Sequence, residues 1–143
     1  MKPHWELAFK PAWELRELIA NKHVSPVEIV EDALQRLDEL NPTLNAFLTV
    51  IPEIAIEEAH KAEHAVMSKQ TLGLLHGLPT SIKDHISTAG IRTTSGSLIF
   101  ENNVPNIDDL IVQRLKSAGA ISLGKTNLPE FGMIAATENF LGN

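Results

Sequence analysis

The stretch from Gly73 to Ser97, GLLHGLPTSIKDHISTAGIRTTSGS, decides the fold that we predict for this chain. It begins with apolar residues and a His-Gly turn, and it ends in a run of serine, threonine and glycine. Residues 78–86 between them have the pattern of a β-strand, whose successive side chains point to opposite faces. One face then carries Leu78, Thr80, Ile82, Asp84 and Ile86, and the other carries Ser81, Lys83 and His85.

Lys83 lies near the end of this predicted strand, beside a loop of small residues. We expect its amine to lose water there, which would disfavour the charged form and make the lysine a better base. A neutral lysine can take a proton from a hydroxyl group, as a general base does. The alternative is an amine that reaches solvent from the strand end.

Two neighbours of Lys83 also carry groups that could do chemistry. His85 shares its face and is a rival base, because histidine as a residue type titrates near neutral pH. Asp84 points the other way by strand parity, and we expect it to bind backbone N–H groups at the start of the Ser/Thr loop. We interpret His85 as a packing or loop hydrogen-bonding residue.

The composition excludes several classes of protein. Of the 143 residues, 43% are apolar, which is enough for a hydrophobic core, and the net charge of −6 argues against direct binding of nucleic acid. The absence of cysteine excludes disulfides and thiolate metal sites. No apolar run approaches the roughly 20 residues of a membrane span, and the N-terminus does not resemble a signal peptide. We therefore expect a cytoplasmic protein that uses no metal and no cofactor.

Helical spacing of apolar residues predicts three helices before residue 70. The first begins near Pro11. The second starts with a capping box at residues 25–28, SPVE, and is expected to end at Asn41-Pro42. The third runs from Pro52 to about Met67. Their predicted inward stripes are Leu15, Leu18 and Ile19 in the first, Val27, Val30, Leu34, Leu37 and Leu40 in the second, and Ala55, Ala59, Ala62 and Val66 in the third.

The second half of the chain has the pattern of a βαβ unit. A loop from Ser87 to Ile107 follows the central strand, and a loop of about 20 residues without regular pattern is usually functional, the alternative being a mobile surface excursion. A helix is predicted from Asp108 and Asp109, with Gly119 after its last turn. Residues 120–123 then form a short strand, which should be parallel to the central one, while residues 46–50 form another. The residues expected to face inward on the helix are Ile111, Val112, Leu115 and Ala118.

Two further patterns are chance matches in our interpretation. His60 and His64 are four residues apart on the third helix, but no further ligand accompanies them, so we expect surface histidines. Residues 119–126, GAISLGKT, match the phosphate-binding pattern GxxxxGK[ST]. That pattern requires a strand before it and a helix after it, whereas here a helix comes first and Pro129 follows. We interpret residues 125–127 as the polar end of a strand.

Together, these segments resemble the amidase signature hydrolases. The resemblance is carried by the stretch quoted first, by the helix at Asp108, by AGAISLGKTNLPEF at 118–131 and by VSPVEIVEDALQRLDELNPTLNAFLTV at 24–50. It covers residues 12–143 and implies an α/β fold, the N-terminal part of an α/β/α domain with a mixed sheet flanked by helices. Within this single domain, residues 1–70 would be a mostly helical lead-in and residues 71–143 a βαβ-type core.

The resemblance also implies a chemistry. Such enzymes hydrolyse carboxylic amides with a serine nucleophile, a second serine on a cis peptide and a lysine, which here is Lys83. Their serines lie in and after a Gly-Gly-Ser-Ser-Gly-Gly loop, and the chain ends at Asn143 before any such loop. We therefore expect the 143 residues to be inactive alone. Gly132 and Met133 would line the acyl-binding channel, the alternative being ordinary packing.

The resemblance leaves several functions open. The first is an amidase acting on a small-molecule amide, and a variant of it is the amidase subunit of a tRNA-dependent amidotransferase, which needs partner subunits. A non-catalytic remnant or interaction module is a second class, and a nucleotide-binding domain based on residues 119–126 is a third. An incomplete sheet would also leave an exposed edge, through which the chain could form homo-oligomers.

Overall fold

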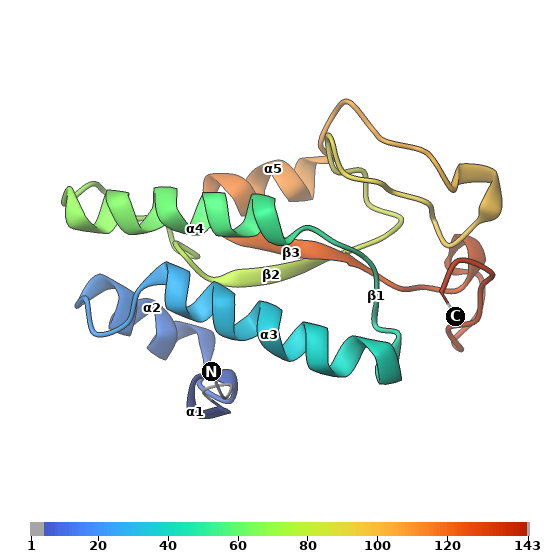
Figure 1. Ribbon diagram of the computed structural model, residues 1–143. Helices are drawn as coiled ribbons and strands as arrows, with labels where there is room; N and C mark the ends of the chain where they lie inside the picture. The colour runs from blue at the N-terminus through green and yellow to red at the C-terminus, as the bar shows by residue number, and fades with distance from the viewer. Residues whose placement is uncertain (1–4, 143) are drawn as a thin grey trace. The chain divides into compact units, whose positions relative to one another are not determined.

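A three-stranded mixed sheet with flanking helices is the framework of the computed structural model, which describes residues 5–142 (Figure 1). The predicted α/β class is confirmed. The helices are α1 (Trp5–Ala8), α2 (Ala12–Ala20), α3 (Pro26–Leu44), α4 (Pro52–Met67) and α5 (Leu110–Ser117). The strands are β1 (Phe47–Val50), β2 (Pro79–Lys83) and β3 (Ile121–Thr126), and the 3₁₀ helices are η1 (Leu98–Phe100) and η2 (Glu130–Gly132).

Contacts between Cα atoms divide the chain into two compact units. Both are assembled from segments that are distant in the sequence. The first unit comprises residues 1–39, 51–80 and 115–123, and the second comprises residues 40–50, 81–114 and 124–143.

The core of the first unit is formed by α2, the start of α3, the end of α4 and the segment before β2. Ile19, Ile29, Val66 and Leu78 are buried together there. The predicted stripe of α4 is confirmed, because its buried residues are Ala55, Ala59, Ala62 and Val66. Small side chains on this face let neighbouring backbone approach closely, and the ring Nε2 of His76 lies 3.0 Å from the carbonyl oxygen of Ala62.

Helix α3 begins as predicted. Glu28 N donates to Ser25 Oγ at 3.0 Å and Ser25 N donates to a Glu28 carboxylate oxygen at 2.8 Å, which completes the capping box. The predicted stripe is only partly correct, since Val30 is buried but Leu40 is 42% exposed. The remaining buried positions of the helix are Pro26, Ile29, Asp32 and Ala33, and the Asp32 carboxylate pairs with Arg36.

The predicted end of this helix at Asn41-Pro42 is wrong, because α3 continues to Leu44 with Pro42 inside its last turn. Proline lacks an N–H and cannot bond to the carbonyl four residues before it, but only two more residues of α3 follow Pro42, so little of the helix depends on it. The helix ends at Asn45, which has a left-handed φ of 49° and donates its N–H to Asn41 O at 2.7 Å. The Asn41 side chain then binds both backbone polar groups of Phe47, at 2.8 and 3.2 Å, and so joins α3 to β1.

Strand β3 is the central strand of the sheet, which has the order β1-β3-β2. Ile121 N donates to Leu78 O at 2.9 Å and Asp84 N donates to Thr126 O at 3.1 Å. The two bonds follow the same order along both chains, so β2 and β3 are parallel, as the βαβ prediction requires. Strand β3 continues beyond the predicted apolar residues 120–123 to Thr126, so Lys125 and Thr126 form the polar end of a strand, as predicted, and Asn127 follows it.

Strand β1 pairs antiparallel with the end of β3, with Val50 opposite Gly124 and an irregularity between Phe47 and Thr49. The backbones are in close contact here. A Cβ atom on Gly124 would lie 2.1 Å from Thr49 O, so only glycine fits this position of β3.

Helix α5 ends as predicted, with Gly119 in the left-handed region at a φ of 88°. Gly119 N donates to Lys116 O and Ala120 N donates to Leu115 O, which is the Schellman arrangement. The predicted inward face is wrong for Ile111, which is 54% exposed, whereas Val112 is 2% exposed. The helix has only eight residues, and Val112 is its buried residue, so its apolar contact with the rest of the chain is narrow.

Candidate functional site

The predicted alternation of side chains is confirmed, although β2 ends at Lys83 and residues 84–86 lie beyond the strand. Ser81, Lys83 and His85 are exposed, whereas Ile82 and Asp84 retain 4% and 0% of their accessible surface. We expected the amine of Lys83 to be shielded from water. The described residues do not shield it, because the side chain of Lys83 is exposed on the face of the strand away from the core. The alternative, an amine that reaches solvent from the strand end, describes the observed position.

Asp84 binds the Ser/Thr loop, as predicted, but near the middle of the loop and not at its start. Its carboxylate accepts the N–H of Thr94 at 2.9 Å and also the Thr94 hydroxyl group. Its backbone carbonyl accepts the N–H of Ser95 at 3.2 Å. These contacts, together with the bond from Asp84 N to Thr126 O, hold the residue immediately after Lys83 at both its backbone and its side chain.

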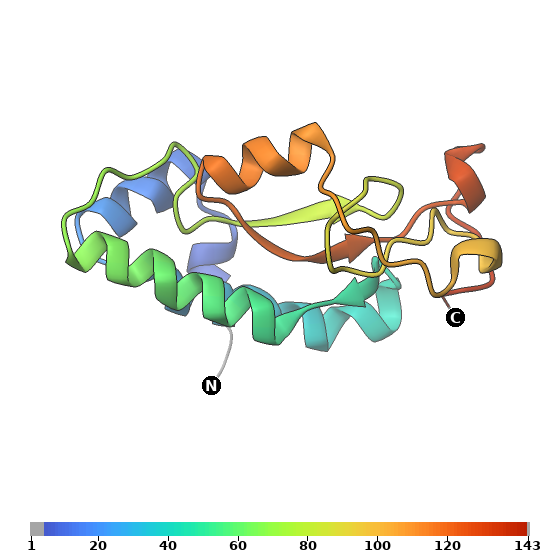
Figure 2. The same cartoon turned by 90° about the horizontal axis from the view of Figure 1, so that it is seen from above.

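The long connection between β2 and α5 folds back on itself as a loop with two paired arms (Figure 2). Its two arms are joined by hydrogen bonds from Gly90 N to Pro105 O and from Thr93 N to Asn103 O, each at 2.9 Å. The Asn103 amide returns a bond to Thr93 O at 2.8 Å. Backbone polar groups of an irregular segment are thus satisfied within the segment itself.

The residue that sequence reasoning missed is Lys125 of β3, which has no accessible surface. Its ammonium nitrogen donates to the carbonyl oxygen of Ile86 and lies 3.0 Å from Thr88 Oγ1 and 2.9 Å from Thr93 Oγ1. Burial lowers the pKa of Lys125 from its ordinary value of 10.5 to about 8, and the nearby carboxylates of Asp84, Asp108 and Asp109 act in the opposite direction. The desolvated lysine of this region is therefore Lys125, not Lys83.

The position of Lys125 also agrees with our rejection of the phosphate-loop match. Gly119 follows helix α5, residues 121–126 are strand, and the short η2 comes only after Pro129. All three N–H groups of the ammonium are used by Ile86, Thr88 and Thr93, so none is directed toward a ligand. The context that this motif needs for phosphate binding is missing from the described structure.

Gly132 and Met133 lie in the second unit, at and just after η2. Gly132 has a φ of 69° and nothing within 4 Å of where a Cβ would be, and Met133 is 79% exposed. Both are therefore open to solvent in the described chain. None of the described hydrogen bonds joins them directly to Lys83.

His60 and His64 are exposed on α4, as predicted. Residues 5–142 contain no group of three or more metal-binding side chains. Within the same range, no helix has the length and apolar character needed to cross a bilayer.

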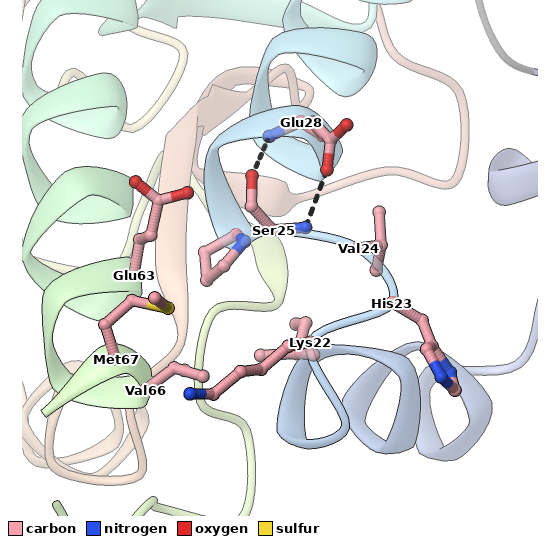
Figure 3. Close-up of a pocket in the computed structure, with 10 residues that line it drawn as sticks. Lys22, His23, Val24, Ser25, Glu28, Glu63, Val66 and Met67 are labelled. Atoms are coloured by element: carbon pink, nitrogen blue, oxygen red, sulfur yellow. Dashed lines mark hydrogen bonds between the residues drawn. The ribbon is translucent and has the colours of Figure 1, made fainter. Parts of the chain in front are cut away.

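A small cavity of about 220 Å³ lies in the first unit, beside the start of α3 (Figure 3). Its wall includes Lys22 and Glu63 together with the capping pair Ser25 and Glu28. Glu28 and Ser25 satisfy each other, so the capping pair itself offers little to a ligand. None of its lining residues belongs to the unit that carries Lys83.

Comparison with known proteins gives the family. The Amidase family model matches residues 28–142, and the chain therefore belongs to the amidase signature family. A curated relative, a glutamyl-tRNA(Gln) amidotransferase subunit from Gloeothece citriformis (strain PCC 7424), is 45% identical over 126 residues, which cover 88% of this chain and 26% of the relative. The chain thus spans about a quarter of the length of that relative.

Two solved structures with the same fold are described as amidases. A peptide amidase from Stenotrophomonas maltophilia is 32% identical with a TM-score of 0.81, over 87% of this chain and 26% of that one. A bacterial aryl acylamidase, described as one of the amidase signature enzymes, is 29% identical with a TM-score of 0.87, over 94% of this chain and 28% of that one. The fold implied by the resemblance is thereby confirmed.

Proposed function

We propose that this chain carries the lysine of an amide-hydrolysing site and that Lys83 is its general base. The observation that supports this most directly is the end of β2, where Lys83 is exposed between two buried neighbours, Ile82 and Asp84, in a chain of the amidase family. Burial of the neighbours fixes the backbone, and the exposed side chain remains accessible to a reacting group.

The proposed mechanism needs two serines of a Gly-Gly-Ser-Ser-Gly-Gly loop, a sequence that residues 1–143 do not contain. We propose that the serine loop covers Lys83 and removes water from its amine, so that Lys83 in its neutral form accepts a proton that the first serine relays from the second. The second serine oxygen bonds to the carbonyl carbon, and the C–N bond breaks as the departing nitrogen takes up a proton. Backbone N–H groups of the glycine-rich loop stabilise the oxyanion, and water then cleaves the acyl-serine ester to release the acid.

We further infer that the protein is the amidase component of a tRNA-dependent amidotransferase and acts with protein partners in the cytoplasm. This is supported by the higher identity to the amidotransferase relative, 45%, than to the peptide amidase, 32%. The self-sufficient amidase and the non-catalytic interaction module are the competing functions. Cell fractionation tests the location, and recovery in the membrane fraction would contradict it.

The experiment uses a longer chain, in which residues 1–142 are joined to the remaining sequence of the Gloeothece relative. We expect it to release ammonia from a primary carboxamide such as glutamine, and to do so faster with the relative's partner subunits. The unaltered relative is the control. Full activity without partners would support a self-sufficient amidase. If the relative releases ammonia and the longer chain does not, the amide-hydrolysing function is contradicted and the interaction module is favoured.

We also propose that Gly132 and Met133 contribute to the binding of the acyl group. The support is their accessibility, since Met133 is 79% exposed and Gly132 is unobstructed. In the longer chain, Met133→Ala should raise KM for amides with bulky acyl groups more than for small ones. An unchanged KM across amides of increasing acyl size would contradict this role.

A further inference from the structure

Lys125 is a buried cation, and each N–H group of its ammonium has a hydrogen-bond acceptor. The Thr88 hydroxyl group donates to Ile86 O at 3.2 Å, and the Thr93 hydroxyl group donates to Ile91 O at 3.0 Å. With their protons committed to these carbonyls, both hydroxyl oxygens act as acceptors for Lys125. The site therefore supplies three acceptors for the three N–H groups of an ammonium ion.

These bonds connect β3 to the backbone that follows Lys83. Ile86 N donates to Lys83 O at 3.0 Å, and the carbonyl of the same Ile86 accepts from Lys125. The next residue of β3, Thr126, accepts the N–H of Asp84. Two adjacent residues of β3 thus hold Asp84 and Ile86, which lie one and three positions after Lys83.

We propose that Lys125 is a positioning residue for the amide-hydrolysing site, and that its ammonium group holds the turn at residues 84–93 and so sets the position of Lys83. This inference rests on the proposed role of Lys83. Lys125 is fully buried and acts through the backbone of Ile86, so contact with the substrate is not needed.

The cost of burying a charge supports positioning over simple stabilisation. A charged group without accessible surface is expensive to desolvate, and an apolar side chain of similar volume is often equally stable in its place. In Lys125→Met, the Thr88 and Thr93 hydroxyl groups keep their bonds to Ile86 O and Ile91 O, so no buried donor is left unpaired. The variant should therefore fold but lose the link between β3 and the turn.

The test measures backbone amide exchange in the purified 143-residue chain and in Lys125→Met. We expect protection of the Ile86 and Thr93 amides to fall about tenfold, which corresponds to the loss of one hydrogen bond to a charged group. Protection of Ala59 in α4 and the midpoint of urea unfolding should be unchanged or raised. Unchanged protection at Ile86 and Thr93, or an equal loss at Ala59, would overturn the proposal.

A matched pair at Thr93 keeps the test decisive if Lys125→Met does not fold. Thr93→Ser retains the hydroxyl oxygen that accepts from Lys125, whereas Thr93→Val removes it and leaves one buried N–H unpaired. We expect the valine variant to lose protection at Ile86 about tenfold and the serine variant to retain it. Equal behaviour of the two variants would contradict the proposal.

Measuring amide hydrolysis by the longer chain distinguishes a failure of this inference from a failure of the proposed function. In the longer chain, Lys125→Met should lower kcat about tenfold with little change in KM, because the base is misplaced while the acyl site is intact. If the longer chain shows no hydrolysis at all, the proposed function fails, and the exchange measurements still decide whether Lys125 positions the turn.

Discussion

The Asp84 carboxylate accepts two hydrogen bonds from one residue, the backbone N–H and the hydroxyl group of Thr94, ten positions along the chain. Both residues have no accessible surface. The Thr94 hydroxyl oxygen also accepts the N–H of Gly96 at 3.1 Å. This one threonine therefore joins the segment after β2 to the middle of the Ser/Thr loop.

Thr94→Val should lower the free energy of unfolding by about 1–3 kcal/mol. The valine removes the hydroxyl group that donates to the buried Asp84 carboxylate and accepts from the N–H of Gly96. Thr94→Ser keeps the hydroxyl group and should lose less. Urea unfolding of both variants measures the difference. A valine variant as stable as the wild-type chain would show that the contact between Asp84 and Thr94 contributes nothing to stability.

Local signals in the sequence predicted most of the elements. Ser25 and Glu28 indicated the start of α3, the alanines of α4 gave its buried face, and the alternation around Lys83 gave the two faces of β2. The burial of Lys125 could not be predicted in this way. It depends on Ile86, Thr88 and Thr93, which are 32 to 39 positions away and close over β3 only when the long loop folds back.

The end of α3 was mispredicted for a similar reason. Asn41-Pro42 is locally a stop signal, but the side chain of Asn41 binds Phe47 and stabilises a turn that begins only at Asn45. A tertiary contact therefore extended the helix beyond its local signal.

Lys125 should make the stability of the chain depend on pH. Its pKa is lowered to about 8 by burial, so the native chain releases this proton at a lower pH than the unfolded chain does. Between about pH 8 and the ordinary lysine value, the unfolded state binds more protons, and stability rises with pH. The gain from about pH 7 to about pH 9.5 should reach about 2 kcal/mol. Urea unfolding at several pH values measures the free energy of unfolding of the wild-type chain and of Lys125→Met. The same dependence on pH in both chains would contradict the lowered pKa.

The 143-residue chain should self-associate in solution. In the described sheet, β1 and β2 are the outer strands, and unpaired strand edges promote association. Sedimentation should show species larger than a monomer, and a single monomeric species would contradict this expectation. Ile99→Asp serves as a control, because Ile99 is 77% exposed in the apolar η1 turn. Loss of association in that variant would assign the contact to η1 and not to a strand edge.

The role of Lys83 is tested most directly by the turnover of a primary carboxamide in the longer chain, with Lys83→Ala compared with His85→Ala. His85 lies in the turn two residues after Lys83 and is exposed as Lys83 is, so the histidine variant controls for a change on that surface. We predict that Lys83→Ala lowers kcat by about 10²–10⁴-fold, as expected for the loss of a general base, and that His85→Ala retains most of the activity. Near-normal turnover in Lys83→Ala, or a comparable loss in His85→Ala, would contradict the assignment of Lys83 as the base.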